Sequence, residues 1–306
     1  MHSKPGMSTT QIVLIVVAVA VVVVLGVGGL LVAILVPALS KAQEMANRAV
    51  CMSNLSSINK GLILYKAYSD DKYPWLHDGI TTWDTATVAT NRTVDPFGPN
   101  DDPKNPKARS TTALMFMLVR NGQLADIFRC PSDRQSKVDD ETKSDQTDGD
   151  VKEGECYFDF SKPENVSYSY QAPLYVGPGK FKNGVDPSES ETAIVADMTP
   201  RYGGSVKWTP IPIADNTPAS EISKQLTNNH KCEQVNVLYI AGNVRGQKRP
   251  DVGYDNSSDG AGPDQIYTAF GNDVKSRRKA TSTDIKDHKS EKDTFLIGPV
   301  GRAEGK

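Results

Sequence analysis

Residues 12–36 read IVLIVVAVAVVVVLGVGGLLVAILV, an aliphatic and glycine run without a single charge. A helix needs roughly 20 such residues to cross a hydrocarbon core about 30 Å thick, so this run is long enough to span a membrane with some tilt. Two other interpretations are a buried core element and a cleaved secretory signal, whose apolar centre is usually only about 7 to 15 residues long. We favour a retained transmembrane helix, because the run is longer than such a centre.

Outside this run the chain is polar and nearly balanced in charge. Its 306 residues include 35 lysines and arginines against 37 acidic residues, and the mean hydropathy is -0.43. There is no excess of positive charge to attract nucleic acid, so we expect no nucleic-acid partner. The sequence also contains no GxSxG elbow, HExxH pair or P-loop, and we therefore expect a protein that is not an enzyme.

The cysteines help to orient the expected anchor. Lys4 precedes the apolar run, and Lys41 and Arg48 follow it, so the distribution of basic residues does not fix the orientation. Four cysteines follow the run, at Cys51, Cys130, Cys156 and Cys232. An even number is compatible with two disulfides in an oxidising compartment, in any of three pairings, and the alternative is four reduced cysteines in a cytoplasmic domain. We favour a head outside the cytoplasm.

The helix is expected to continue beyond the membrane. From residue 37 to residue 69, apolar residues recur at steps of three or four, and this pattern predicts an amphipathic helix with a buried stripe. The stripe consists of Leu39, Ala42, Ala46, Ala49, Leu55, Ile58, Leu62 and Tyr65. The turn-forming residues SDDKYP from Ser69 onwards should end the helix. We expect this stripe to pack against a sheet.

The rest of the chain predicts an α+β head. TALMFMLV at 112–119 is typical of a short helix, and β-branched and aromatic residues predict strands at 168–175, 192–196, 206–208 and 235–240. A long helix followed by strands favours an antiparallel sheet packed on the helix. We therefore divide the chain into a short N-terminal leader or tail (1–11), a transmembrane helix (12–36), its amphipathic continuation (37–69), an extracytoplasmic head (70–270) and a polar C-terminal segment (271–306). In this last segment FLIGPV can form a final strand, and the alternative is a fully disordered tail.

Three stretches carry a resemblance to a known family. LVAILVPALSKAQEMANRAVCMSNLSSINKGLILYKAYSDDKYPW at 31–75, IFRCPSD at 127–133 and NNHKCEQVNVLYIAGNVR at 228–245 resemble segments of type IV pilin-like and type II secretion pseudopilin-like proteins, especially the large planctomycete group. The resemblance is close over the first quarter of the chain and is limited to short islands beyond it. It implies a pilin-like fold and a non-enzymatic structural subunit held in the inner membrane, with other pilin-like subunits or the secretion machinery as partners.

The resemblance also implies roles for particular residues. Gly6 and Met7 suit a prepilin-peptidase cleavage site, but Gln11 stands where the family has a glutamate, and a neutral side chain there weakens the case for polymerisation. By analogy with the family's cysteines, Cys51 should pair with Cys130, and Cys156 would then pair with Cys232. In the late strand, Ala241 and Asn243 replace the family's aspartate and histidine, which leaves His230 alone.

Two polar groups are candidate metal sites. Asp255, Ser257, Asp259 and Asp264 alternate oxygen-bearing side chains like a calcium loop, and pseudopilins as a family have a calcium site in the same region. The run lacks the closing glutamate of an EF-hand, and its other interpretation is a plain polar turn. His230 and Cys232 are possible metal ligands or a catalytic pair, but without a CxxC motif or a second nearby histidine we expect a structural role. No other cofactor is expected.

Three functions follow from these observations. The first is a structural pilin-like or pseudopilin-like subunit whose helix packs against others in the membrane. The second is a monomeric anchored module whose head binds a secreted protein or a glycan, a reading that Gln11 favours. The third is an anchored enzyme, which would need a polar cluster in a pocket.

Overall fold

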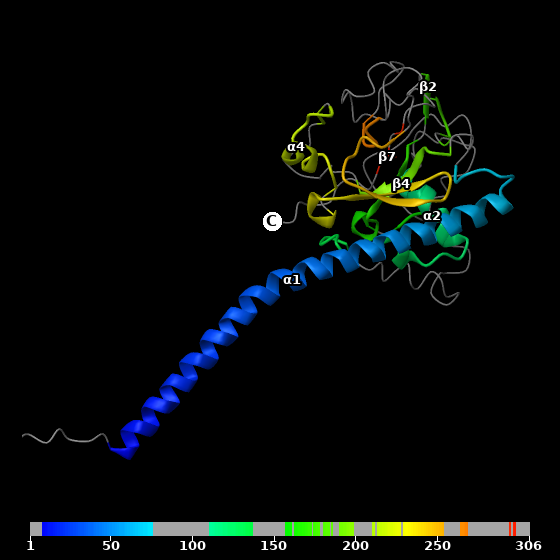
Figure 1. The fold of residues 1–306 in the computed structure, drawn as a ribbon. Coiled ribbons are helices and arrows are strands. Elements are labelled where there is room, and N and C mark those ends of the chain that lie inside the picture. Colours follow the sequence, from blue (N-terminus) through cyan, green and yellow to red (C-terminus); the bar gives the residue numbers. More distant parts are fainter. Residues whose placement is uncertain are drawn as a thin grey trace, which may run out of the picture. The chain divides into compact units, whose positions relative to one another are not determined.

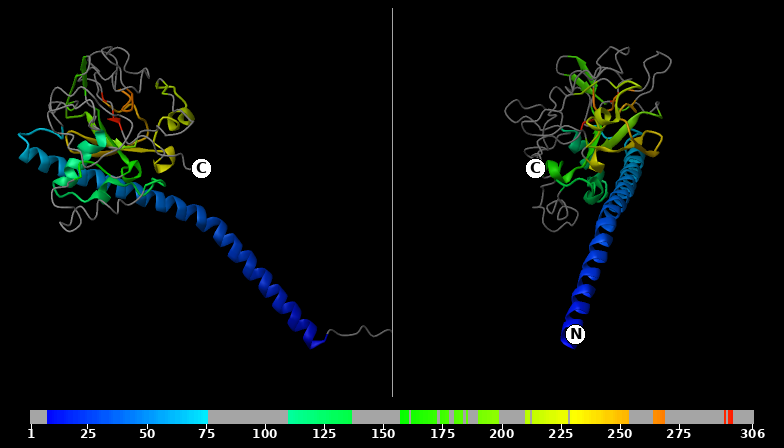
Figure 2. Two further views of the ribbon diagram at one scale, coloured as in Figure 1. Left: turned by 180° about the vertical axis from the view of Figure 1, so that it is seen from behind. Right: turned by 60° about the vertical axis from the view of Figure 1, so that its left-hand side comes forward.

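The computed structural model describes residues 8–75, 110–136, 157–160, 162–172, 174–177, 180–183, 185, 190–198, 210–211, 213–227, 229–253, 264–268, 294 and 296–297. The helical elements are α1 (Thr9–Tyr68), α2 (Thr111–Arg120), η1 (Ala125–Phe128), η2 (Pro163–Asn165), α4 (Ala219–Ser223) and η3 (Asn229–Cys232). The strands are β1 (Tyr168–Gln171), β2 (Leu174–Gly177), β3 (Lys180–Lys182), β4 (Ala193–Asp197), β5 (Val235–Tyr239), β6 (Val244–Gln247) and β7 (Leu296–Ile297). Figure 1 and Figure 2 show their arrangement.

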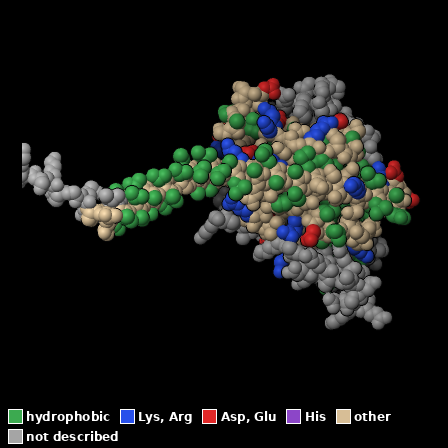
Figure 3. All heavy atoms as spheres, turned by 60° about the horizontal axis from the view of Figure 1, so that its bottom comes forward, with side chains coloured by type: hydrophobic (Ala, Val, Ile, Leu, Met, Phe, Trp, Pro, Cys, Tyr) green, Lys and Arg blue, Asp and Glu red, His purple; other side chains and the backbone are tan. Residues whose placement is uncertain are grey.

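The long helix α1 continues through Pro37 and contains 60 residues. It ends where Asp70 and Asp71 adopt positive φ angles of 50° and 60°, and the Asp71 amide donates back to the Lys66 carbonyl. In its N-terminal part, side chains such as Val22 and Leu25 are each 69% exposed, and hydrophobic side chains line the visible face of this part in Figure 3. By length and composition, α1 can cross a membrane.

The chain divides into two compact units, Met1–Ala46 and Asn47–Lys306. The division therefore falls inside α1, ten residues C-terminal to the expected end of the membrane span at Val36. Asn47–Lys306 contains the head and the last six turns of α1, because an α-helix has about 3.6 residues per turn.

An antiparallel sheet forms the centre of the head. Its five strands are ordered β6-β5-β4-β1-β7, and all of its described pairings are antiparallel. The strands β2 and β3 form a separate antiparallel pair. Every residue of β1, β4 and β5 is buried, so both faces of the central strands are covered.

Each face of the sheet has its own core. On one face, Leu238 of β5 joins the cluster that contains α1 and α2, and on the other Val235, Val237 and Tyr239 pack with Ile266 and Tyr267. The alternation follows from the period of two in a strand. In β4 the register shifts between Ala193 and Val195.

The head half of α1 buries the C-terminal part of the predicted stripe. Cys51, Leu55, Ile58 and Leu62 are at most 1% exposed and pack in one cluster with the aromatic side chains of β1. One apolar stripe is enough to hold an amphipathic helix against a sheet, so the other side of the helix can stay exposed.

Several expectations are confirmed and others need correction. The α+β class, the end of the long helix and the short helix at 111–120 agree with the sequence analysis. The N-terminal part of the stripe does not: Leu39 is 69% exposed, and Ala42, Ala46 and Ala49 are exposed as well. The expected strand 168–175 is two strands, β1 and β2, and the sequence carries Pro173 between them. Proline cannot donate to a strand ladder.

The C-terminal predictions are tested only in part. Leu296 and Ile297 form β7, which pairs with β1, so these two residues of the expected polar segment 271–306 belong to the sheet of the head. The expected strand 206–208 lies outside the described residues.

Candidate functional site

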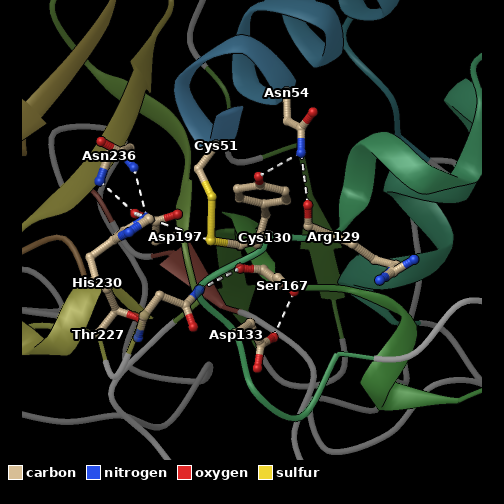
Figure 4. Close-up of a disulfide and its surroundings, with 12 residues drawn as sticks. Cys51, Asn54, Arg129, Cys130, Asp133, Ser167, Asp197, Thr227, His230 and Asn236 are labelled. Carbon is tan, nitrogen blue, oxygen red and sulfur yellow. Dashed lines mark hydrogen bonds and ion pairs between the residues drawn. A yellow bond between two sulfur atoms is a disulfide. The ribbon is translucent and has the colours of Figure 1, made fainter. Parts of the chain in front are cut away.

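A buried disulfide lies at the centre of the head (Figure 4). Cys51 and Cys130 are 79 positions apart in sequence, their Cα atoms are 5.3 Å apart, and both are 0% exposed. This is the pair that the family resemblance implies. Cys51 points into the core because it stands on the same face of α1 as Leu55, Ile58 and Leu62. The bond fixes α1 to the segment that follows η1.

The turn that carries Cys130 is fixed by an aspartate. In the CPSD sequence the Asp133 amide donates to the Cys130 carbonyl at 3.0 Å. The Asp133 carboxylate accepts bonds from the Gln135 amide at 3.1 Å and from the Ser167 hydroxyl at 2.6 Å. Aspartate is well suited to such turns because its short side chain bonds the backbone two residues on. The turn is thereby tied to the residue before β1.

The 3-10 segment η3 places His230 beside the disulfide in an unusual backbone conformation. His230, Lys231 and Cys232 have φ angles of 57°, 59° and 56°. This left-handed region costs an L-residue roughly 1–2 kcal/mol, so three in a row need support from their surroundings. Arg48 of α1 supplies part of it, since its guanidinium donates to the His230 carbonyl at 3.2 Å and forms an ion pair with Glu233.

The His230 imidazole is 0% exposed and its Nε2 atom faces three partners. Nε2 lies 3.0 Å from Asn236 Nδ2, 3.4 Å from Asp197 Oδ2 and 3.5 Å from Cys130 Sγ. The Asn236 amide is oriented by Gln234, whose Nε2 donates to Asn236 Oδ1 at 2.8 Å. With this orientation of the side-chain amide, Asn236 Nδ2 donates to His230 Nε2, which accepts in the tautomer that carries its proton on Nδ1.

Asp197, the last residue of β4, is also 0% exposed. Its Oδ2 accepts a hydrogen bond from the backbone N–H of Asn236 at 2.6 Å. Its Oδ1 is buried and has no hydrogen-bond partner among the described residues. Burial, together with the charge of Asp197, raises the pKa of Tyr168 well above its usual value, although a hydrogen bond from Asn54 opposes the rise. A buried carboxylate with an unpaired oxygen costs free energy, so this position calls for an explanation.

Asn54 of α1 completes the surroundings of the disulfide. Its Nδ2 donates to the Arg129 carbonyl at 2.7 Å and to the Tyr168 hydroxyl at 3.3 Å. Asn54 therefore joins the helix both to β1 and to the residue that precedes Cys130. Figure 4 shows these bonds on the side of the disulfide away from His230.

The structure tests only some of the predicted site residues. Gly6, Met7, Cys156, Asp255, Ser257 and Asp259 lie outside the described residues, so cleavage, the second bridge and the calcium loop stay predictions. Gln11 lies in the first turns of α1. Cys232 is half-buried, and burial raises the pKa of its thiol in the reduced form.

Asp264, the remaining calcium candidate, has a structural contact. It is 0% exposed, and its Oδ2 accepts a bond from the Thr294 amide at 2.8 Å. A Cβ at position 253 would stand 1.6 Å from Asp264 Oδ1, so only glycine fits beside this carboxylate. The carboxylate thus connects the segment before Ile266 to the approach to β7.

Sequence reasoning missed Asp197 and Asn236. Both lie in strands whose residues are all buried, and a charged or amide side chain in the apolar runs AIVAD and VNVLY is a signal that could have found them. Polar groups in such strands are buried at a cost and usually have specific partners.

Together, these residues form a sealed polar cluster around a cross-link. The two sulfurs, the imidazole and the Asp197 carboxylate come from four different parts of the chain and are all 0% exposed. In the part of the chain that the structure describes, this cluster is therefore closed to solvent. In comparisons with known proteins, no family model, no curated protein and no solved structure matches this chain.

Proposed function

We propose that this protein is a non-enzymatic, pilin-like or pseudopilin-like structural subunit of a type II secretion or type IV pilus-related system. In this proposal residues 12–36 hold it in the inner (cytoplasmic) membrane as a single-pass protein, and the head lies in the periplasm or outside the cell. Its partners are other pilin-like subunits or the secretion machinery.

The observation that carries the proposal is that α1 has two roles, as an exposed apolar helix and as part of the core of the head. One uninterrupted helix presents exposed apolar side chains over its N-terminal part and supplies Leu55, Ile58 and Leu62 to the core of the head. A simple membrane tether does not need to be continuous with the core of the domain that it carries. A subunit whose helix packs beside others in a membrane would use both features, the apolar surface for packing and the buried stripe for its own head.

The disulfide and its neighbours support the compartment and the absence of catalysis. A fully buried disulfide between Cys51 and Cys130 fits a head that folds in an oxidising compartment. The buried polar cluster around it is closed to solvent, which supports a structural role for His230.

The test is a cysteine scan of α1 in native membranes. Cys156 and Cys232 are first replaced by serine, and single cysteines are then placed one at a time at positions 13–25, whose side chains are exposed. Specific helix packing gives oxidised dimers at positions that repeat every three or four residues, because only one face of each helix meets its neighbour. Equal, low yields at all positions are the result of random collisions and would contradict the proposal.

The mature N-terminus provides a second readout. Mass spectrometry of the protein from its native membrane should show a start at Met7, since a prepilin peptidase would remove the first six residues. A chain that still begins at Met1 and gives no periodic cross-links is instead a permanently anchored monomer.

The second candidate is that monomer, an anchored module whose head binds a partner. Gln11 favours it, because a neutral side chain cannot form the ion pair with a neighbouring subunit that a glutamate can form inside a membrane. Uniform cross-linking in the scan, together with an intact N-terminus, would make this candidate the better account.

A further inference from the structure

We propose that the head contains a redox-gated zinc site: when the Cys51–Cys130 disulfide is reduced, both sulfurs, His230 Nε2 and the Asp197 carboxylate bind one zinc ion. This inference is independent of whether the protein forms filaments. It concerns the same buried cluster but gives it a second chemical state.

The positions of the four ligand atoms fit a tetrahedral ion. One ligand atom from each of the four residues lies within 4.8 Å of all the others. In a tetrahedral zinc site, bond lengths of about 2.0–2.3 Å place neighbouring ligand atoms about 3.3 to 3.8 Å apart. His230 Nε2 is already 3.5 Å from Cys130 Sγ and 3.4 Å from Asp197 Oδ2. Once the sulfur–sulfur bond is broken, the two sulfurs can move apart to the separation that a zinc ion requires.

The two ligands that are not cysteines have atoms suited to a metal. In the tautomer that accepts from Asn236 Nδ2, His230 Nε2 carries a lone pair and lies 3.5 Å from Cys130 Sγ. A zinc ion would take this lone pair in place of the Asn236 amide group, because a neutral imidazole nitrogen is a common metal ligand. Asp197 Oδ1 is a buried oxygen with no hydrogen-bond partner among the described residues. A cation bound to the Asp197 carboxylate would offset the cost of burying this oxygen, which the disulfide does not do.

The surrounding structure would hold the ligands in place. The backbone N–H of Asn236 donates to Asp197 Oδ2 at 2.6 Å and would orient this ligand, whereas the bond between the Asn236 side chain and His230 Nε2 would be replaced by the bond to zinc. Partners of this kind orient metal ligands in known sites. The cysteines come from α1 and from the turn after η1, so a bound ion would join the same two segments as the disulfide and would add β4 and η3 to the connection.

The composition of the cluster favours zinc over other common ions. Two thiolates and an imidazole are ligands that zinc prefers, whereas calcium and magnesium prefer sets composed of oxygen. All four residues are 0% exposed, which leaves no open position for water or substrate. The site would therefore be structural, and it would stabilise the reduced head.

The conversion balances with a phosphine as the reductant. The phosphine supplies the two electrons that break the sulfur–sulfur bond and is oxidised to a phosphine oxide. One water molecule supplies the oxygen of that oxide, and the two protons of the same water go to the thiols. Zinc then replaces those two protons, which leave to the solvent, and forms two zinc–sulfur bonds.

The experiment measures metal binding by the full-length chain in detergent micelles. Cys156 and Cys232 are replaced by serine, so that Cys51 and Cys130 are the only cysteines left. The protein is reduced with a phosphine without oxygen, the reductant is removed, and zinc or cobalt is added. We expect one ion per reduced chain, a cobalt spectrum with sulfur charge-transfer bands, a zinc-dependent rise in Tm, and no binding by the oxidised chain.

Matched variants identify the ligands. Asp197→Asn preserves the shape of the side chain, and His230→Asn suits the left-handed backbone at this position. Each should weaken zinc binding by about tenfold or more, and Cys51→Ala should abolish it, whereas Lys231→Asn, next to His230 but outside the cluster, should have no effect.

Three outcomes would overturn the inference. The first is a reduced chain that is folded but binds no zinc, and the second is a reduced chain that stays unfolded when zinc is added. The third is binding that is equally tight in the Asp197→Asn and His230→Asn variants.

Discussion

Two tyrosines of β1 differ at the scale of a single hydroxyl group. Tyr168 and Tyr170 are both at most 1% exposed. The Tyr168 hydroxyl accepts a bond from Asn54, whereas the Tyr170 hydroxyl has no hydrogen-bond partner among the described residues. A buried polar group without a partner costs about 1–3 kcal/mol, so the two hydroxyls should have opposite effects on stability.

We therefore expect Tyr170→Phe to raise the free energy of unfolding by about 1 kcal/mol, because it removes an unsatisfied group without changing the shape of the ring. Tyr168→Phe is the matched control and should lower it by about 1 kcal/mol, because it leaves Asn54 with one partner fewer. Urea unfolding at pH 7 measures both changes. Equal destabilisation by the two variants would show that the Tyr170 hydroxyl has a partner.

The same phenols predict how stability depends on alkaline pH. Burial raises the pKa of Tyr170 well above its usual value, and the nearby Tyr73 and Tyr65 raise it further. The unfolded chain therefore loses this proton first, as the pH passes about 10. Titration of Tyr170 therefore leaves the free energy of unfolding unchanged below that pH. It lowers this free energy as the pH rises from there toward the pKa of the folded state.

Above pH 10, each such phenol should lower the free energy of unfolding by about 1.4 kcal/mol per pH unit. Tyr170→Phe should make this slope shallower by that amount, with no change in slope between pH 7 and 9. Unfolding curves collected at pH 7, 9, 10 and 11 provide the comparison. A variant whose slope equals that of the unchanged chain would mean that Tyr170 does not titrate in this range.

At the scale of elements, the head half of α1 is stabilised by one face only. Leu62 is 1% exposed and belongs to the core, while Leu64, two residues further on, is 41% exposed. Two residues correspond to about 200° around a helix, so the two leucines lie on nearly opposite sides. They allow the same substitution to be compared inside and outside the core.

Leu62→Ala should lower the free energy of unfolding by about 2–5 kcal/mol, because it removes buried methyl groups and leaves a cavity. Leu64→Ala should change it by no more than about 0.5 kcal/mol. Both variants keep a good helix former at the position, so helix propensity does not explain a difference. Similar losses in the two variants would indicate that a partner covers the Leu64 side of the helix.

The sequence was informative where one periodic pattern dominated. The apolar run and the stripe from Leu55 to Leu62 predicted α1 and its buried face, because apolar residues spaced by three and four lie on one face of an α-helix. The stripe failed at Leu39 because periodicity shows which residues share a face and not where the partner surface begins. The polar cluster could not be predicted, because Asp197 of β4 reaches Asn236 and His230 only through the pairing of β4 with β5.

At the scale of the whole molecule, the two compact units differ in where their apolar side chains lie, buried in one unit and exposed in the other. All the residues of both hydrophobic clusters lie within Asn47–Lys306. The unit Met1–Ala46 contributes exposed apolar side chains, which in water would favour aggregation or insertion into a membrane. The head should therefore not need the apolar half of α1 to fold.

A chain that begins at Asn47 should be soluble without detergent, form the Cys51–Cys130 disulfide and unfold cooperatively. Its free energy of unfolding should lie within about 1 kcal/mol of the value for the head in the full-length chain, because the truncation removes no side chain of either cluster. The control is a chain that begins at Ser57, which lacks Cys51 and Leu55 and should not fold. Circular dichroism and thiol titration distinguish the two. A head from Asn47 that aggregates while the full-length chain is folded in micelles would contradict this expectation and would mean that the head needs residues before Asn47 to be stable.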